Sequence, residues 1–196
     1  MNLLQESLYW LTSGLLVPCI VYLLFMLFQC LFGLGRYVAN KAIQAESLKN
    51  LEHWMRDSEL NLPALPSSTE HLSSNNAINS IIASDSLALN QQVVGRFEIE
   101  SESYLNKFSN LAKLGPITGL VGTLIPMGPA LKGLADGNIQ QLAGQMQIAF
   151  STTVIGLIVG AIGLILYQKH KSQVFKELAV LDFILDHQER EHEKSK

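Results

Sequence analysis

The sequence predicts an all-α integral membrane protein with three transmembrane helices and long cytoplasmic helical extensions. Hydrophobic residues make up 48% of its 196 residues and charged residues only 16%, with a mean hydropathy of +0.22, which is more apolar than an ordinary soluble domain. The apolar residues gather in three stretches that are each long enough to cross a bilayer core, which takes about 20 helical residues. Lys and Arg lie almost entirely outside these stretches.

Residues 1–38 are predicted to form the first transmembrane helix, because the run Leu8–Leu34 contains no Lys, Arg, Asp, Glu or His. The first basic residue is Arg36, so no basic segment precedes the apolar run and we interpret it as a retained helix rather than a cleavable signal. Large apolar groups surround the whole helix, which favours contact with lipid. Cys19 and Cys30 are predicted to be small buried hydrophobes, with a disulfide or a metal role as the alternative.

Residues 111–134 and 146–168 are predicted to form the second and third transmembrane helices, joined by a short outer turn at 135–145. The second stretch is the least apolar, because it contains three prolines as well as Lys113 and Lys132. Both lysines lie at its ends, where their charged groups can reach the membrane surface. A re-entrant segment is the alternative for this stretch.

The distribution of basic residues predicts the orientation of the chain in the cell (inner) membrane. All of them except Lys132 lie between the first and second spans or after the third, so we expect the N-terminus outside and the C-terminus in the cytoplasm. Residues 39–110 then form a cytoplasmic helical insertion, whose Ser- and Asn-rich middle, 58–90, reads as a flexible loop with short helical pieces at best.

Residues 169–196 are predicted to form a cytoplasmic C-terminal helix that continues the third span. Its apolar residues repeat at heptad-like spacing: Val174, Leu178, Leu181 and Leu185. This spacing is typical of a packed helical seam. We expect the seam to pack against the extensions of the first two spans, with a separate docking surface as the alternative.

The second and third spans each carry a face of small residues with a hydroxyl on it. In the second span this face holds Gly119, Thr123, Pro126 and Ala130, with Gly115 and Gly122 beside it; in the third it holds Ala149, Thr153, Gly156, Gly160 and Gly163. Such faces let membrane helices pack closely, with the threonines bonded to their own preceding turn. Pro116, Pro126 and Pro129 each free a backbone carbonyl, which needs a partner in a neighbouring helix, a hydroxyl or water in a cavity. A lined passage is therefore the functional interpretation of the same residues.

No Asp, Glu, His or Lys lies deep within any span. Proton paths through membranes are usually built from ionisable side chains, so another polypeptide would have to bring the carboxylate. The five histidines show no metal-ligand spacing, and there is no Gly-rich phosphate loop. We therefore predict no catalytic site, no cofactor and no metal, and the net charge of −3 offers no basic patch for nucleic acid.

Two segments of the last two spans resemble the MotA/TolQ/ExbB proton channel family. The first is Leu114-Gly115-Pro116-Ile117-Thr118-Gly119-Leu120-Val121-Gly122-Thr123-Leu124. The second is Met146 to Tyr167, with Ser151-Thr152-Thr153-Val154-Ile155-Gly156-Leu157. A proline-glycine-glycine-threonine helix is paired here with a threonine-glycine helix at the expected distance. The first span and the cytoplasmic insertion match the layout of the family only generically.

The resemblance implies a ring-forming homo-oligomer, a pentamer, in membrane lipid around two copies of a single-span partner similar to MotB, TolR or ExbD. The membrane aspartate of that partner would carry the proton, and proton-motive force would rotate ring and core relative to each other. The resemblance implies an ion pathway at Thr123 and Thr153, to which we add Thr152 and Ser151. It also implies structural roles in the pore helices for Pro116, Gly119, Gly122, Pro126, Gly156 and Gly160.

Two positions depart from the pattern of the family. Ile148 stands where many TolQ- and ExbB-like members have a glutamate, and Gly163 stands where many have a proline. MotA-like members also lack the glutamate, so the channel hypothesis does not depend on it.

The leading hypothesis is a stator subunit that couples proton-motive force to mechanical work, and the alternative is a non-conducting oligomeric membrane scaffold. The resemblance favours protons, whereas hydroxyl-lined pores also suit sodium. The residues are compatible with several driven processes: outer-membrane protein transport, envelope maintenance, motility or defence.

Overall fold

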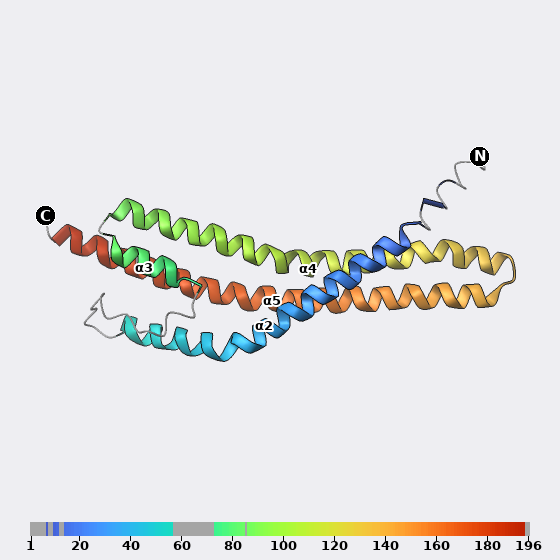
Figure 1. Cartoon of the computed structure of the whole chain (residues 1–196), viewed down its shortest axis with the longest axis horizontal. Helices are drawn as coiled ribbons and strands as arrows, with labels where there is room; N and C mark the ends of the chain where they lie inside the picture. The colour runs from blue at the N-terminus through green and yellow to red at the C-terminus, as the bar shows by residue number, and fades with distance from the viewer. Residues whose placement is uncertain (1–6, 8–9, 12–13, 57–72, 85, 195–196) are drawn as a thin grey trace. The chain divides into compact units, whose positions relative to one another are not determined.

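The computed structural model describes residues 7, 10–11, 14–56, 73–84 and 86–194. Over these residues the chain forms four helices: α2 (Leu16–Arg56), α3 (Asn75–Ala83), α4 (Leu87–Ala135) and α5 (Ile139–Lys194) (Figure 1). The chain divides into two compact units. We call Met1–Gly35 with Lys107–Tyr167 the membrane unit, and Arg36–Asn106 with Gln168–Lys196 the extension unit.

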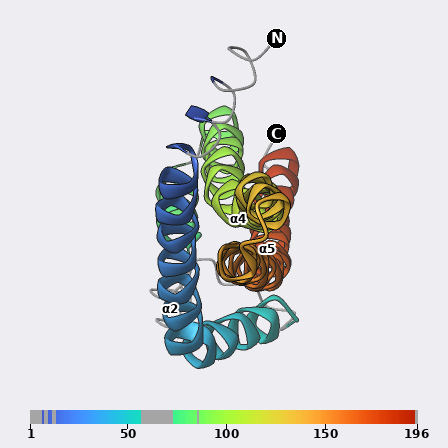
Figure 2. The ribbon, with the colours of Figure 1, turned by 90° about the vertical axis from the view of Figure 1, so that its right-hand side faces the viewer.

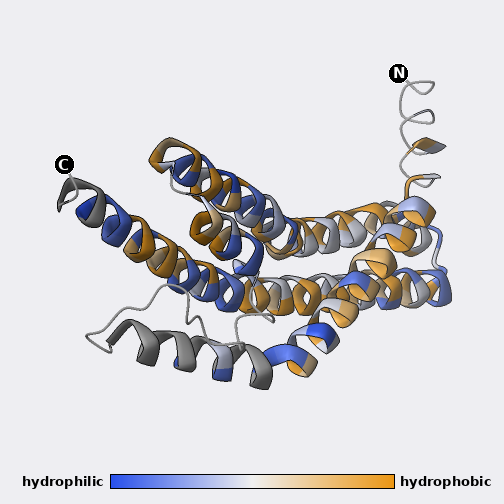
Figure 3. Ribbon diagram, turned by 60° about the vertical axis from the view of Figure 1, so that its left-hand side comes forward, coloured by the Kyte–Doolittle hydropathy of each residue, from blue (hydrophilic) through white to orange (hydrophobic). Residues whose placement is uncertain are grey.

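Three of these helices, α2, α4 and α5, are long and apolar enough to cross a membrane. Figure 3 shows apolar residues gathered along them in the membrane unit. The predicted all-α fold with three membrane-spanning helices is therefore confirmed. Helix α4 has 49 residues and α5 has 56, more than twice the roughly 20 that cross a bilayer core, so both helices continue beyond it. Helix α4 is unbroken over residues 111–134, which favours a single crossing over the re-entrant alternative.

The turn between α4 and α5 is shorter than the predicted 135–145, because α5 already begins at Ile139. Gly137 adopts a positive φ of 72°. The N–H of Asn138 donates to Gly133 O (2.7 Å) and the N–H of Gly137 to Leu134 O (3.1 Å), which is the glycine-dependent hydrogen-bond pattern that ends a helix. The side-chain oxygen of Asn138 then accepts the N–H of Gln141 at 3.0 Å and caps the start of α5.

In the membrane unit α4 and α5 run side by side in opposite directions, and α2 lies along one side of the pair (Figures 1 and 2). Helix α2 buries Leu23, Met26 and Cys30, which share one face at helical spacing. Most of its other large apolar residues are exposed: Val17, Val21, Tyr22, Leu24, Phe25, Phe28, Leu31 and Phe32. An exposed apolar surface of this kind is what lipid covers in a membrane-spanning helix.

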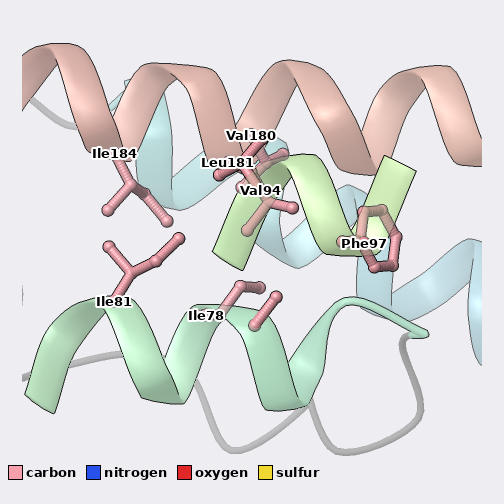
Figure 4. Close-up of a cluster of buried hydrophobic side chains, with 8 residues drawn as sticks. Ile78, Ile81, Val94, Phe97, Val180, Leu181 and Ile184 are labelled. Atoms are coloured by element: carbon pink, nitrogen blue, oxygen red, sulfur yellow. The ribbon is translucent and has the colours of Figure 1, made fainter. Parts of the chain in front are cut away.

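The extension unit has its own hydrophobic core, formed where α3 packs against α4 and α5 (Figure 4). Its buried residues are Ala77, Ile78 and Ile81 of α3, Val94 and Phe97 of α4, and Val180, Leu181 and Ile184 of α5. Leu178 and Leu185 pack against this core. The predicted seam of the C-terminal helix is thus a packing surface, and α3 supplies much of its partner.

Helix α3 lies within the segment 58–90 that was predicted to be a loop with short helical pieces. Its nine residues contain a regular apolar face, which the surrounding Ser and Asn residues obscure in the sequence. Helix α4 begins at Leu87, inside the same segment. The part of the predicted loop at residues 58–72 lies outside the described residues.

Candidate functional site

The small-residue faces predicted for the second and third spans meet each other in the membrane unit. A Cβ added at Gly156 would lie 2.7 Å from both the Cα of Gly119 and the carbonyl oxygen of Gly115. One added at Gly115 would lie 2.9 Å from the backbone nitrogen of Gly160. Since the obstructing atoms are backbone atoms, side chains larger than hydrogen would force the helices apart, and these glycines set the spacing of α4 and α5.

The prolines of α4 take part in this contact. A Cβ added at Gly160 would lie 2.6 Å from Cγ of Pro116, so the ring of Pro116 fills the space that Gly160 leaves. The side chain of Pro126 is fully buried. The carbonyl of Ala112, which Pro116 deprives of its amide partner, lies 3.4 Å from the same Cβ position at Gly160 and therefore faces α5. The carbonyl that Pro116 frees is therefore covered by a neighbouring helix and not by lipid.

Thr123 and Thr153 lie at one level of the helix pair. The register follows from Gly122, where an added Cβ would meet Cβ of Thr152 at 2.7 Å and its Oγ1 at 2.8 Å. Thr123 directly follows Gly122, and Thr153 directly follows Thr152. Both threonines are therefore one residue removed from the same contact.

The two threonines also turn to the same side of the pair. Successive residues of an α-helix are rotated by about 100° about its axis, always in the same sense. In two antiparallel helices, the residues that directly follow the interface residues therefore point to the same side of the pair. The residues that directly precede the interface residues point to the other side, and that is where α2 lies. Cys19 Sγ donates to Thr118 O (3.7 Å) and Cys30 Sγ to Val159 O (3.6 Å), and Thr118 and Val159 directly precede Gly119 and Gly160. Thr123 and Thr153 thus share the side away from α2.

Each of these hydroxyls donates a hydrogen bond to its own helix. Thr123 Oγ1 donates to Leu120 O at 2.6 Å, and Thr153 Oγ1 donates to Ala149 O at 3.2 Å. Both side chains are half-buried. While these bonds hold the hydroxyl protons, each oxygen can accept a hydrogen bond from water or from a protonated carboxyl group. To donate to an ionised carboxylate, a hydroxyl must turn away from its own carbonyl.

Ser151 and Thr152 do not share this arrangement. Thr152 is only 4% exposed and fills the space opposite Gly122, with its hydroxyl donating to Ala149 O at 2.9 Å. Ser151 is exposed, bonds to Gln147 O at 2.8 Å, and precedes Thr153 by two residues, which places it on nearly the opposite side of α5. Of the four residues assigned to the ion pathway, the structure brings together Thr123 and Thr153 only.

Both cysteines are free, so the structure contains no disulfide between them. Cys30 is buried as predicted, whereas Cys19 is partly exposed, and both thiols donate to backbone carbonyls. Their bonds attach α2 to α4 and to α5. The partners of these thiols are main-chain atoms, so no side-chain pattern in the sequence could have indicated them.

The extension unit contains a buried carboxyl, Glu177, that the sequence reasoning missed. It is 0% exposed. Its Oε2 accepts the backbone N–H of Ser74 at 2.9 Å and its Oε1 accepts Nε2 of Gln173 at 3.0 Å. Burial raises the pKa of this carboxyl above its ordinary value, while the hydrogen bonds from Gln173 and Ser74 oppose the shift. Glu177 lies three residues after Val174 and four before Leu181, which is the spacing of one helix face. This spacing was the signal in the sequence that Glu177 would lie on the buried face.

A model of the family described as MotA/TolQ/ExbB proton channel family matches residues 70–182. The match covers more than half of the chain and runs from just before α3 to the middle of the extension-unit core. It therefore includes α3 and the first three residues of the α5 seam, Val174, Leu178 and Leu181, as well as the two segments that carry the resemblance. No curated protein and no solved structure matches the chain.

Proposed function

The chain belongs to the MotA/TolQ/ExbB proton channel family, and from this premise we propose that it is the ring-forming subunit of an ion-driven stator. In this proposal the ring couples proton-motive force to mechanical work together with a single-span partner that carries an aspartate in its membrane helix. The chain itself performs no catalysis and holds no cofactor.

The observation that carries the proposal is the shared position of Thr123 and Thr153. They lie at one level and on the side away from α2, in helices without an ionisable side chain over Leu114–Leu131 and Ile148–Leu166. Hydroxyls can solvate a carboxylate and its water but cannot carry a proton by titration at ordinary pH. The titrating group must then come from the partner, and the two threonines are the protein groups that receive it.

The proposed assembly is a pentamer around two copies of a MotB-, TolR- or ExbD-like partner. Helices α4 and α5 line the central passage and α2 faces lipid, with the N-terminus outside the inner membrane and the C-terminus in the cytoplasm. The exposed apolar surface of α2 is compatible with contact with lipid, and the threonines on the side away from α2 support the place of α4 and α5 around the passage.

The test is co-expression of the chain with the single-span protein encoded beside its gene, followed by mass measurement of the intact complex and reconstitution into liposomes. We expect a complex of several copies of this chain with the partner, and proton uptake when a membrane potential is applied. A chain that purifies as a monomer with the partner present, or a complex that carries no ion flux, contradicts the proposal.

The second candidate is a non-conducting membrane scaffold. The bonds of both threonine hydroxyls to their own helix favour it, because such bonds need no ion path. Cross-linking discriminates between arrangements: contact of α2 with the partner, with α5 at the rim, would overturn the proposed ring.

A further inference from the structure

The carbonyl oxygen of Ala149 has more donors than lone pairs. Thr152 Oγ1 reaches it at 2.9 Å and Thr153 Oγ1 at 3.2 Å. The backbone N–H of Thr153 also points at it, because α5 is helical here and the helix pairs each N–H with the carbonyl four residues before. A carbonyl oxygen has two lone pairs, so three donors compete for it. Of the two hydroxyl bonds, that of Thr153 is the longer and therefore the weaker.

The Thr152 hydroxyl is held in place by the close contact of the two helices. Its Cβ, Oγ1 and Cγ2 lie 2.7, 2.8 and 3.2 Å from the position that a Cβ at Gly122 would take, so the side chain occupies the space that Gly122 leaves and is packed against α4. At 4% exposure it does not reach the side of Thr123 and Thr153. Thr153, in contrast, is half-buried at the edge of the same contact.

We propose that Thr152 is a positioning residue for Thr153: by occupying the Ala149 carbonyl, it leaves the hydroxyl of Thr153 weakly held and free to turn toward the carboxylate of the partner. This inference rests on the proposed function and adds a role to a residue that does not line the ion path itself. Gly122 is required for this position of Thr152, since only a residue without a side chain leaves room for Thr152 between the helices.

The test compares substitutions of Thr152 in the complete complex with its partner. Thr152→Val keeps the shape against Gly122 but removes the competing donor, so Thr153 binds the carbonyl more tightly and driven proton flux falls about two- to tenfold, which is what one hydrogen bond is worth. Thr152→Ser keeps the hydroxyl and restores flux to near the wild-type level. The mass of the complex stays unchanged in both variants. Equal flux in Thr152→Val and wild type overturns the inference.

Thiol labelling separates this role from a direct one. In a chain with Cys19→Ala and Cys30→Ala, a water-soluble maleimide should label Thr153→Cys in the assembled complex and leave Thr152→Cys unlabelled. Equal labelling of both places Thr152 in the ion path and overturns the positioning role. If the wild-type complex conducts no ions at all, the proposed function fails; if it conducts and the Thr152 variants do not differ from it, only this inference fails.

Discussion

At the scale of single residues, a threonine in a membrane helix can serve packing or function, and its surroundings distinguish the two roles. Thr118, Thr123 and Thr153 all bond back to their own helices. Thr118 lies beside α2, because its carbonyl accepts the Cys19 thiol, whereas Thr123 and Thr153 lie on the side away from α2. Thr123 and Thr153 therefore differ from Thr118 in the side of the helix pair on which they lie, and not in their hydrogen bonding.

We predict that Thr123→Val and Thr153→Val each leave assembly nearly intact and abolish ion-driven activity. Valine keeps the shape of threonine and removes the hydroxyl that solvates the carboxylate of the partner. Packing alone predicts little effect, since each hydroxyl bonds only to its own helix and the loss of such a back-bond costs little stability. The measurements are complex mass and driven proton flux.

Thr118→Val is the matched control for these variants, because it removes a similar back-bonded hydroxyl from the same helix as Thr123. It should retain full flux. Full ion-driven function in both Thr123→Val and Thr153→Val would remove these threonines from the ion path and favour the scaffold.

At the scale of helices, α4 and α5 approach so closely that backbone touches backbone. We predict that Gly156→Ala weakens this pair by about 1–3 kcal/mol, the usual cost of overpacking, because its Cβ would lie 2.7 Å from the Cα of Gly119. The measurement is the thermal midpoint of the detergent-solubilised complex.

Gly144→Ala, in the same helix α5, serves as its control, since a Cβ there meets nothing within 4 Å. Alanine favours helix over glycine, so this variant should be neutral or slightly more stable. Equal midpoints for Gly156→Ala and Gly144→Ala would show that the glycine contact does not set the helix spacing.

Glu177 joins α5 to the start of α3 in the extension unit, and its raised pKa has a consequence for stability. The folded state binds this proton more tightly than the unfolded state, so the contribution of Glu177 to stability is complete below its ordinary pKa of 4.5 and is lost as pH rises through the raised value.

We predict that Glu177→Gln, which is always neutral, gains stability relative to wild type as pH rises from about 4 to 8. The measurement is the difference in thermal midpoint between the two proteins across that range. Asp186→Asn, at an exposed residue paired with Arg190, is the control and should show no such gain. A constant difference between Glu177→Gln and wild type would show that the burial of Glu177 does not shift its titration.

At the scale of the whole molecule, a chain that lacks an ionisable group in its spans depends on a partner for conduction. We predict that the purified chain without its partner leaks few protons in liposomes, because a narrow passage lined by hydroxyls and small apolar residues stays dry. The measurement is dye-reported proton uptake under an applied potential, with and without the partner. Substantial flux through the chain alone contradicts the need for an external carboxylate.

The membrane class and the three spanning helices could be predicted from the sequence alone, because hydrophobic length is a local property of the chain. The family could be predicted from the resemblance of two segments in the last two spans. The sequence also placed Thr123 and Thr153 among the candidates. The packing of α4, α5 and α2 was needed to distinguish them from Thr152 and Ser151. Which side of the helix pair a residue faces is defined only once these helices are packed together.

The extension unit shows the same division. The seam of α5 and the place of Glu177 on its buried face could be predicted from their spacing. The packing of α3 against this seam and the hydrogen-bond partner of Glu177 could not. Burial of a carboxyl depends on a backbone N–H of Ser74, 103 residues away in sequence, and no pattern within one helix reports a contact of that separation. The features that could not be predicted are thus contacts between segments far apart in the sequence, which form only when the chain folds.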